Sequence, residues 1–456
     1  MTGSLLVGHL ADIHLGTRKY GGSKLVLPPG YTVPEEYSSL LAWDAARMLE
    51  ASLETLTGEG VRHVLLSGDV FDVPRPDNRT LAWAGRLFRR YTEGGGVRII
   101  AVPGDHDTPG GRDATPLDTL SSLIPGFHLL RAYPGVSIER SLRLDAGDAV
   151  FYGLPYVRAG VEKRRLLTRK LSERLAALSR ADEDLGKPRI LLAHYGLAGY
   201  THPDDAIGHP QELPPVDYAA MGHVHARYLR ADWRPPFAYP GSLVPLSLDE
   251  ARQDYKRGPL LVEVEAGAGR AVVSELAVEP PRSYHVVEAH YGSVESEVAR
   301  AIRGARSPEP PLVHVVLVGV PGDVGERLLS RDLAQAAKRL NVIVRLARVV
   351  RARRHGRVAA GEEPVESSPE RLELELLKRH VLGDEGLARD LLRLKEALIV
   401  DPSGEAVHII RESILSEERQ QVWARILETQ SQDREKPAKG RSRKPRRGRR
   451  LDDFLA

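Results

Sequence analysis

Residues 101–107 read AVPGDHD, in which a run of apolar residues is followed by a Pro-Gly turn and then by a histidine between two aspartates. A surface turn needs only one aspartate or glycine for its geometry, so the group Asp105-His106-Asp107 has more polar side chains than a turn requires. This excess indicates a chemical role if other turns of the chain show the same arrangement.

Four other apolar segments end in Asp or His in the same way. They are LLVGHLADIH (5–14), VLLSGDVFD (64–72), ILLAHYG (190–196) and YAAMGHVH (218–225). In open α/β sheets, ligands gather beyond the carboxyl ends of the strands, so these five strand ends are expected to converge on one rim. Side chains at i and i+2 of a strand point the same way, so the D-x-H and H-x-H pairs each place two ligands there.

The residue types at these strand ends are those of a two-metal hydrolytic site. The chain has no cysteine, which excludes disulfides, thiolate metal sites and cysteine nucleophiles. Two divalent cations about 3.5–4 Å apart need mixed carboxylate and imidazole ligands, and such a pair activates water and clamps a phosphate ester. Each motif alone has an ordinary explanation as a cap or turn, but five in one order favour the metal site.

Composition changes along the chain indicate its domains. Short apolar runs alternate with helical patterns up to about residue 255, which predicts an α/β domain. Strand-like segments then surround two helical stretches, which predicts a smaller α+β domain, and a polar linker with amphipathic helices follows. The last residues have almost nothing apolar to bury and are predicted to be disordered. The predicted boundaries are 1–257, 258–360, 361–430 and 431–456.

The ordered set D-x-H, G-D, G-(N/D)-H-D, H and G-H-x-H resembles the calcineurin-like metallophosphoesterase superfamily. HLADIHLG (9–16), GDVFD (68–72), YPGS (239–242) and the domain order resemble the meiotic recombination eleven family, the nuclease subunit of a DNA double-strand-break repair complex. The resemblance is specific from residue 5 to about 255 and looser beyond. It implies a layered α/β/β/α sandwich, with residues 258–360 as a capping domain that positions DNA.

The resemblance also implies a role for each polar residue at the strand ends. Two divalent metal ions, commonly manganese in this family, would be bound by seven side chains. The implied ligands are Asp12, His14 and His225 for the first ion, Asp105, His194 and His223 for the second, and Asp69 as the bridge. His106 would contact the scissile phosphate and assist the leaving oxygen, and Asp107 would orient His106.

Two residues depart from the family pattern. Asp105 stands where the family usually has Asn, and Asp72 stands where some relatives have a His that helps the transition state. The added charge of Asp105 should tighten binding of the second ion and weaken its Lewis acidity. We therefore expect slower turnover or a different metal preference rather than inactivity.

Other polar residues have two open interpretations. His9 lies inside the first strand and is expected to be packed rather than catalytic, and His202 and His209 lie in a loop that could contact substrate. A strand-like stretch near residue 350 is rich in arginine, which suits either phosphate contacts or a charged edge strand. Its arginines are Arg345, Arg348, Arg351, Arg353, Arg354 and Arg357.

The C-terminal part carries the expected partner sites. By resemblance, helices within 368–428 would hold a coiled-coil ATPase related to chromosome-maintenance proteins, and the protein would be a homodimer; a helical hairpin packed on its own chain is the alternative. Ten Lys and Arg residues against one Glu between 434 and 450 predict non-specific DNA affinity. LDDFLA (451–456) resembles a sliding-clamp-binding peptide, although Gly448 stands where the usual glutamine would be.

The favoured function is a manganese-dependent DNA exonuclease and endonuclease that acts on double-strand ends and hairpins in break repair. The alternatives are a phosphatase or phosphodiesterase on the same fold, and a non-catalytic DNA-end-binding scaffold of the repair complex. No apolar run approaches membrane-spanning length and the N-terminus lacks a basic signal-peptide start, so a soluble, cytoplasmic protein is expected. Only two asparagines and 3 methionines suggest a thermophile.

Overall fold

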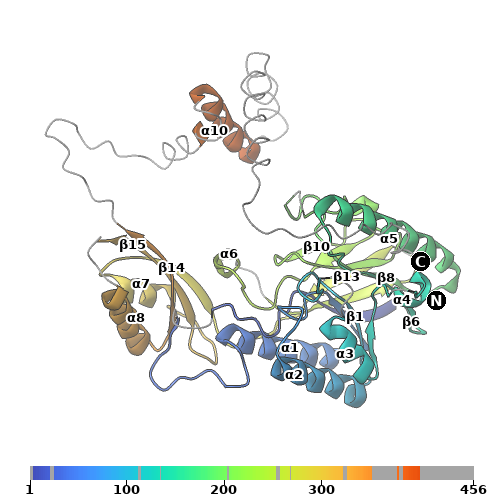
Figure 1. The fold of residues 1–456 in the computed structure, drawn as a ribbon, viewed down its shortest axis with the longest axis horizontal. Helices are drawn as coiled ribbons and strands as arrows, with labels where there is room; N and C mark the ends of the chain where they lie inside the picture. Colours follow the sequence, from blue (N-terminus) through green and yellow to red (C-terminus); the bar gives the residue numbers. More distant parts are fainter. Residues whose placement is uncertain are drawn as a thin grey trace, which may run out of the picture. The chain divides into compact units, whose positions relative to one another are not determined.

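Figure 1 shows the computed structural model of the chain. The residues that it describes are 4–20, 25–110, 114–133, 135–202, 205–252, 257–267, 269–321, 326–351, 377–378 and 384–400. The chain divides into two compact units, one that extends to residue 354 and one that spans 355–450. The five strand ends that carry the Asp and His residues all lie in the first unit.

Two six-stranded sheets form the centre of the first unit. The first sheet has the order β13 (Arg270–Glu275), β12 (Leu260–Glu265), β1 (Ser4–Leu10), β3 (His63–Ser67), β4 (Arg98–Val102) and β5 (Phe127–Leu129). The second has the order β10 (Tyr228–Arg230), β11 (Phe237–Tyr239), β9 (Tyr218–Gly222), β8 (Arg189–His194), β7 (Val150–Leu154) and β6 (Arg143–Asp145). The inner strands run parallel, so their carboxyl ends share one edge in each sheet.

Helices cover the outer face of each sheet. Against the first sheet lie α1 (Leu40–Gly58), α2 (Asn78–Arg89) and α3 (Pro116–Leu123), whose apolar faces share one core with β1, β3 and β4 (Figure 1). Against the second lies α5 (Val161–Ala181). A third core, with Val7, Leu65, Ile190 and Tyr218, joins strands of both sheets. The arrangement is therefore the predicted α/β/β/α sandwich.

The helices begin where the sequence offers caps. Ser39 accepts a hydrogen bond from the backbone N–H of Ala42 at the start of α1, and Asp77 accepts one from Thr80 at the start of α2. Such caps satisfy N–H groups that have no partner within the helix. Both helices belong to the helical patterns that the sequence shows before residue 255.

A smaller four-stranded sheet follows in the chain. Its order is β14 (Tyr284–His290), β15 (Leu312–Val320), β16 (Ile343–Arg351) and β2 (Leu25–Val26), and it packs with α7 (Val294–Ala301) and α8 (Glu326–Leu340). This sheet and its two helices form the expected α+β region.

The strands nearest the expected boundary at 257/258 belong to the larger domain. The segments LLVEVE and AVVSEL, which the boundary assigned to the capping domain, form β12 and β13, and β12 pairs antiparallel with β1. Conversely, β2 from the N-terminal part pairs with β16 in the small sheet. An alternating pattern of apolar and polar residues indicates a half-buried strand, but it does not indicate which strand will be its neighbour or in which sheet it will lie.

The remaining elements are short or lie in the second unit. They are α4 (Ile138–Ser141), α6 (Leu248–Arg252), α10 (Glu385–Val400), a π-helical turn (Arg90–Gly94) and two 3-10 turns (Glu183–Leu185 and Pro210–Glu212). The helix α10 lies within the segment 361–430, for which amphipathic helices are predicted. The basic tail and LDDFLA lie outside the described residues. None of the described helices combines the length and apolar composition needed to cross a bilayer.

Candidate metal centre

The polar residues singled out in the sequence follow the carboxyl ends of strands in both sheets. Asp12 and His14 follow β1, Asp69 follows β3 and Asp105 follows β4, while His194 ends β8 and His223 and His225 follow β9. The two sheets approach closely at this rim, where the Ser67 hydroxyl donates a hydrogen bond to the Ala220 carbonyl at 3.0 Å. The five strand ends therefore meet, as expected.

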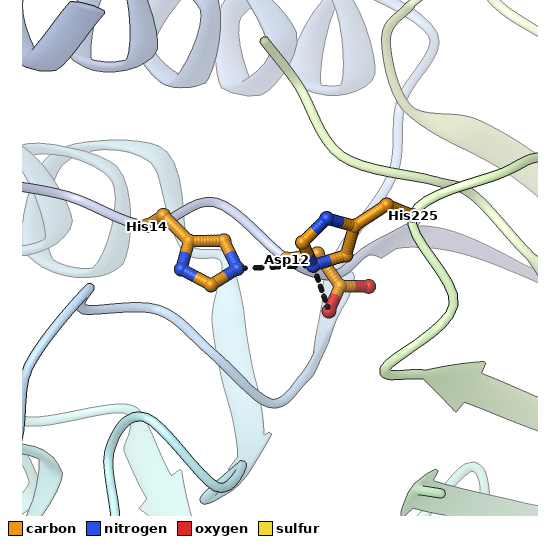
Figure 2. Close-up of side chains that lie close together, drawn as sticks. All are labelled: Asp12, His14 and His225. Carbon is orange, nitrogen blue, oxygen red and sulfur yellow. Dashed lines mark hydrogen bonds and ion pairs between the residues drawn. The ribbon is translucent and has the colours of Figure 1, made fainter. Parts of the chain in front are cut away.

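One group of donors consists of Asp12, His14 and His225. The Nε2 atoms of the two imidazoles lie 3.3 Å apart, and His225 Nε2 lies 3.8 Å from Asp12 Oδ1. Figure 2 shows both rings directed at the same point beside the Asp12 carboxylate. Asp12 and His14 are fully buried, so this group faces inward from the rim.

A second group consists of Asp105, His194 and His223. One oxygen of the carboxylate, Asp105 Oδ1, lies 3.1 Å from His194 Nε2 and 3.1 Å from His223 Nδ1. The other ring nitrogen of His194, Nδ1, lies 2.8 Å from the Ser67 carbonyl, to which it donates a hydrogen bond. That bond leaves Nε2 directed at Asp105.

Asp69 lies between the two groups. Its Oδ2 atom is 3.6 Å from His14 Nε2 and 3.4 Å from His194 Nε2. Its Oδ1 atom accepts a hydrogen bond from the backbone N–H of His106 at 2.8 Å, which fixes the carboxylate. A carboxylate that reaches both groups has the position of a bridging ligand.

These donors fit a pair of divalent cations. Within each group the donor atoms lie within 4.8 Å of one another. Nitrogen and oxygen atoms bound to one cation at about 2.0–2.2 Å lie roughly 3 Å apart or somewhat more, which is the spacing found here. Mixed imidazole and carboxylate sets suit manganese, iron and zinc, whereas calcium and magnesium favour oxygen donors alone.

The backbone at the donors is strained. Four of them have positive φ angles: Asp12 (52°), His14 (54°), Asp69 (51°) and His223 (87°). Non-glycine residues adopt this region at a cost of about 1–3 kcal/mol each, and such strain is concentrated at functional sites. Gly68 allows the close approach of the sheets, because a Cβ atom there would lie 2.2 Å from His194 Nδ1.

The clustered carboxylates and imidazoles shift one another's pKa values. Burial disfavours the charged form of His194, but the carboxylates of Asp69 and Asp105 outweigh burial and raise its pKa well above the usual value. Burial likewise raises the pKa of Asp69, yet the imidazoles of His194 and His14 lower it to about 2. Burial also raises the pKa of Asp105, but the imidazoles of His194 and His223 outweigh it and lower this pKa, so both carboxylates are ionised at neutral pH.

His106 lies at the rim of the centre and is half exposed. Its Nδ1 atom lies 2.7 Å from the backbone carbonyl of Asp72, to which it donates, and its Nε2 atom lies 3.9 Å from Asp105 Oδ2. The ring is therefore held with Nε2 facing the donors, and its contact with a substrate phosphate stays a prediction.

Asp107 does not orient His106, contrary to the expectation from the sequence. Its side chain is fully buried and accepts hydrogen bonds from the backbone N–H groups of Val70, Phe71 and Gly104 at 2.9–3.2 Å. Burial and the nearby charge of Asp69 raise the pKa of Asp107 to about 7, although these three donors oppose the rise. Asp107 thus joins the turn after β3 to the turn after β4.

Replacing Asp107 with asparagine is expected to destabilise the fold by about 1–3 kcal/mol. Both carboxylate oxygens accept backbone N–H groups, so the amide NH₂ of asparagine would face at least one donor and leave it unpaired. Denaturant unfolding of the metal-free protein measures the loss. The control Asp249→Asn changes a side chain that is 88% exposed. Equal stabilities of the two variants would contradict the clamp role of Asp107.

The other histidines of interest lie outside the two donor groups. His9 is fully buried in β1 and its Nδ1 atom lies 2.9 Å from the Tyr218 hydroxyl, so it is packed, as expected. Burial lowers the pKa of His9 to about 3, which keeps it neutral. His202 and His209 belong to none of the candidate donor groups found among the described residues.

Two carboxylates next to the donors contact the ligating imidazoles without being indicated by the sequence pattern. Asp72 Oδ1 lies 3.1 Å from His14 Nδ1, and Glu250 Oε1 lies 3.1 Å from His225 Nδ1. Asp72 was noted only as a departure from the family, and Glu250 lies outside every motif. The GDVFD segment could have indicated Asp72, but no sequence signal indicated Glu250.

A groove opens beside the centre between the turns after β1, β3 and β4. Its volume is about 520 Å³, and its lining residues include Arg18, Asp72 and Arg75. Both arginines are exposed. A groove with cationic side chains next to the donors suits a substrate with several phosphates.

Several known proteins are similar to this chain. The profile of a family described as Calcineurin-like phosphoesterase matches residues 5–227, which include all seven donors. The DNA double-strand break repair protein Mre11 of Aeropyrum pernix is 29% identical over 373 residues, 79% of this chain and 82% of the relative. The SbcD component of the nuclease SbcCD from Escherichia coli is 25% identical over 276 residues, 53% of this chain and 61% of the relative. The crystal structure of TT1561 from Thermus thermophilus has a TM-score of 0.35 and 11% identity, and the match covers 60% of this chain and 99% of that one.

Proposed function

This chain belongs to the calcineurin-like phosphoesterase family and, within it, to the group of Mre11 and SbcD proteins, and we propose that it is a manganese-dependent DNA exonuclease and endonuclease in double-strand-break repair. The observation that carries the proposal is the convergence of two donor groups on one carboxylate, Asp69, which lies between them. A site of this form hydrolyses phosphate esters.

The seven donors would hold two cations in the proposed mechanism. The first would bind to Asp12, His14 and His225, the second to Asp105, His194 and His223, and Asp69 would bind to both. When bound, the ions would supply Lewis-acid stabilisation of the phosphate and an activated water molecule. Hydrogen bonds to the backbone hold donors such as His194 and Asp69 in place, so little reorganisation is needed when substrate arrives.

His106 would act on the substrate itself. Its Nδ1 atom donates a hydrogen bond to the Asp72 carbonyl, so Nε2 faces the centre, and in the imidazolium form Nε2 would pass its proton to the leaving oxygen. The family role of a histidine at position 72 is absent here, since Asp72 contacts His14 instead. Among the described residues, His106 is an imidazole at this rim that the proposed ligand sets do not use.

DNA is favoured over a small phosphate ester because of the groove beside the centre. Arg18 and Arg75 line this groove. The guanidinium of Arg158 donates a hydrogen bond to the backbone carbonyl of Asp105 at 2.7 Å, in the turn after β4. Several cations around the centre match a polyanion better than a single phosphate.

A substrate comparison tests this proposal against its alternatives. The full-length protein is incubated with Mn²⁺ and, separately, with end-labelled linear duplex DNA, a DNA hairpin, a phosphoprotein and a cyclic nucleotide. The nuclease hypothesis expects EDTA-sensitive cleavage of both DNA substrates and little turnover of the others. Hydrolysis of the phosphoprotein or cyclic nucleotide alone would support a phosphatase or phosphodiesterase. DNA binding without cleavage, and with one Mn²⁺ or none per chain, would support a scaffold.

Replacing Asp105 with asparagine is expected to retain cleavage and to raise turnover or shift the metal preference. The amide oxygen reaches the same ligand position, while loss of the charge loosens binding of the second ion and increases its Lewis acidity. Turnover on duplex DNA and Mn²⁺ content per chain are measured together. If the variant lost all cleavage while its Mn²⁺ content stayed normal, the account of Asp105 would be wrong.

The partners of the proposed nuclease are inferred from its relatives and its C-terminal sequence. We propose that a coiled-coil ATPase binds the helices within 368–428, of which the structure describes α10. We also propose that the intact complex contains a homodimer of this chain. DNA affinity of the basic tail and clamp binding by LDDFLA remain predictions, as does a cytoplasmic location. Co-purification of the full chain with such an ATPase, and its loss on removal of residues 368–428, tests the first assignment.

A further inference from the structure

Each of the two imidazoles in the first donor group has a carboxylate next to its Nδ1 atom, the ring nitrogen that does not face the other donors. His14 Nδ1 lies 3.1 Å from Asp72 Oδ1, and His225 Nδ1 lies 3.1 Å from Glu250 Oε1. An ionised carboxylate only accepts hydrogen bonds, so each imidazole carries its proton on Nδ1. Nε2 then points away from the carboxylate in both rings, and the two Nε2 atoms lie 3.3 Å apart (Figure 2).

The carboxylates are themselves held in place. Glu250 Oε2 accepts hydrogen bonds from the backbone N–H of Leu246 at 2.9 Å and the Ser242 hydroxyl at 3.1 Å, while Oε1 accepts from the Ser247 hydroxyl. Asp72 is fixed through its own backbone, whose N–H donates to the Leu15 carbonyl at 3.0 Å. Both carboxylates are only 13% exposed, so solvent competes little for their partners.

The imidazoles of the second donor group are held differently. His194 donates to a neutral backbone carbonyl, that of Ser67. His223 directs Nδ1 toward Asp105, which is itself one of the donors. A charged partner behind the first group therefore distinguishes it from the second.

We propose that Asp72 and Glu250 are positioning residues that direct His14 Nε2 and His225 Nε2 at the first metal ion and increase their basicity. This inference rests on the proposed two-cation site and adds two residues to it. A carboxylate behind a ligating imidazole fixes both the tautomer and the ring orientation, and its removal typically lowers metal affinity about 10–100-fold. The backbone carbonyl of residue 72 orients His106, so the Asp72 side chain can be changed without removing that bond.

A metal titration of full-length variants tests the inference. Binding of Mn²⁺ is followed by the electron paramagnetic resonance signal of the free ion, for the parent protein and for Asp72→Ala, Asp72→Asn, Glu250→Ala and Glu250→Gln. We expect each alanine variant to weaken one of two binding steps about 10–100-fold and to leave the other within about threefold. The amide variants keep an acceptor oxygen without the charge, so they should fall between the alanine variants and the parent.

Two matched controls separate positioning from general effects of charge or stability. Asp148→Asn removes a carboxylate bonded to another imidazole, His63 Nε2, at 2.9 Å, and Asp249→Asn removes one on the same short helix as Glu250. Neither control should change either binding step, and the metal-free alanine variants should unfold within a few degrees of the parent.

The outcomes distinguish this inference from the proposed function. A parent protein that binds two Mn²⁺ ions, with alanine variants that bind like the parent, would overturn the positioning roles and leave the nuclease proposal standing. Equal weakening of both steps together with a large loss of thermal stability would also overturn them, because that pattern indicates a structural role. A parent protein that binds no Mn²⁺ would overturn the two-cation site itself.

Discussion

Replacing Asp69 with alanine is expected to lower DNA hydrolysis by about 10³-fold or more. The Asp69 carboxylate lies within 3.6 Å of an imidazole in each donor group, so its loss would remove the proposed bridge between the two proposed cations. Metal-centred stabilisation of the transition state amounts to several kcal/mol, and each 1.36 kcal/mol changes the rate about tenfold. Single-turnover cleavage of end-labelled duplex DNA at saturating Mn²⁺ gives the rate.

The same variant separates a catalytic loss from unfolding. Asp69 also accepts the backbone N–H of His106, so thermal unfolding and Mn²⁺ content are measured beside the rate. Asp148→Asn is the control, because Asp148 is half exposed and pairs with His63 outside both donor groups. An Asp69→Ala protein that is folded and cleaves DNA within tenfold of the parent would exclude Asp69 as the bridge.

Replacing Arg282 with alanine is expected to destabilise the protein by about 3–5 kcal/mol. Arg282 and Asp44 are fully buried, and Arg282 Nε lies 2.8 Å from Asp44 Oδ2. Arg282 also donates to the Pro310 carbonyl and the Tyr31 hydroxyl, so it ties α1 to the segments that enter the small sheet. Without the guanidinium, a buried carboxylate would remain with little compensation.

Denaturant unfolding of the full chain measures this effect. Arg47→Ala is the matched control, because Arg47 pairs with Glu309 in the same region but its side chain is 37% exposed. An exposed pair contributes at most about 1 kcal/mol. The double change Arg282→Met with Asp44→Leu should destabilise less than Arg282→Ala, because it leaves no unpaired charge. Equal losses in the Arg47 and Arg282 single variants would contradict this account.

Much of the metal centre could be predicted from local pattern. An apolar run followed by Asp or His marks a strand end, and parallel strands of one sheet end at a common edge. Asp12, Asp69, Asp105 and His194 were therefore placed correctly relative to their strands, and the structure brings them together. His9 was assigned to the core for a similar reason, since it lies inside a strand rather than at its end.

The direction of a side chain at a turn could not be read in the same way. Asp107 follows His106 directly, yet its carboxylate turns into the protein and binds the backbone of Val70 and Phe71. Adjacent residues in a turn have different φ and ψ angles, so proximity in sequence does not imply contact between side chains. The partner of His106 is instead the carbonyl of Asp72, which belongs to another strand end.

The sequence by itself determined the fold class, the strand ends and the side chains that meet there, because these follow from the alternation of apolar and polar residues along short segments. Only the tertiary structure decided which sheet β12 and β2 join, that Glu250 lies behind His225, and that Arg282 pairs with Asp44, 238 residues away. Such pairings depend on how whole sheets and helices pack together. That packing is set by the summed burial of many side chains and leaves no signal at the individual residues that it brings into contact.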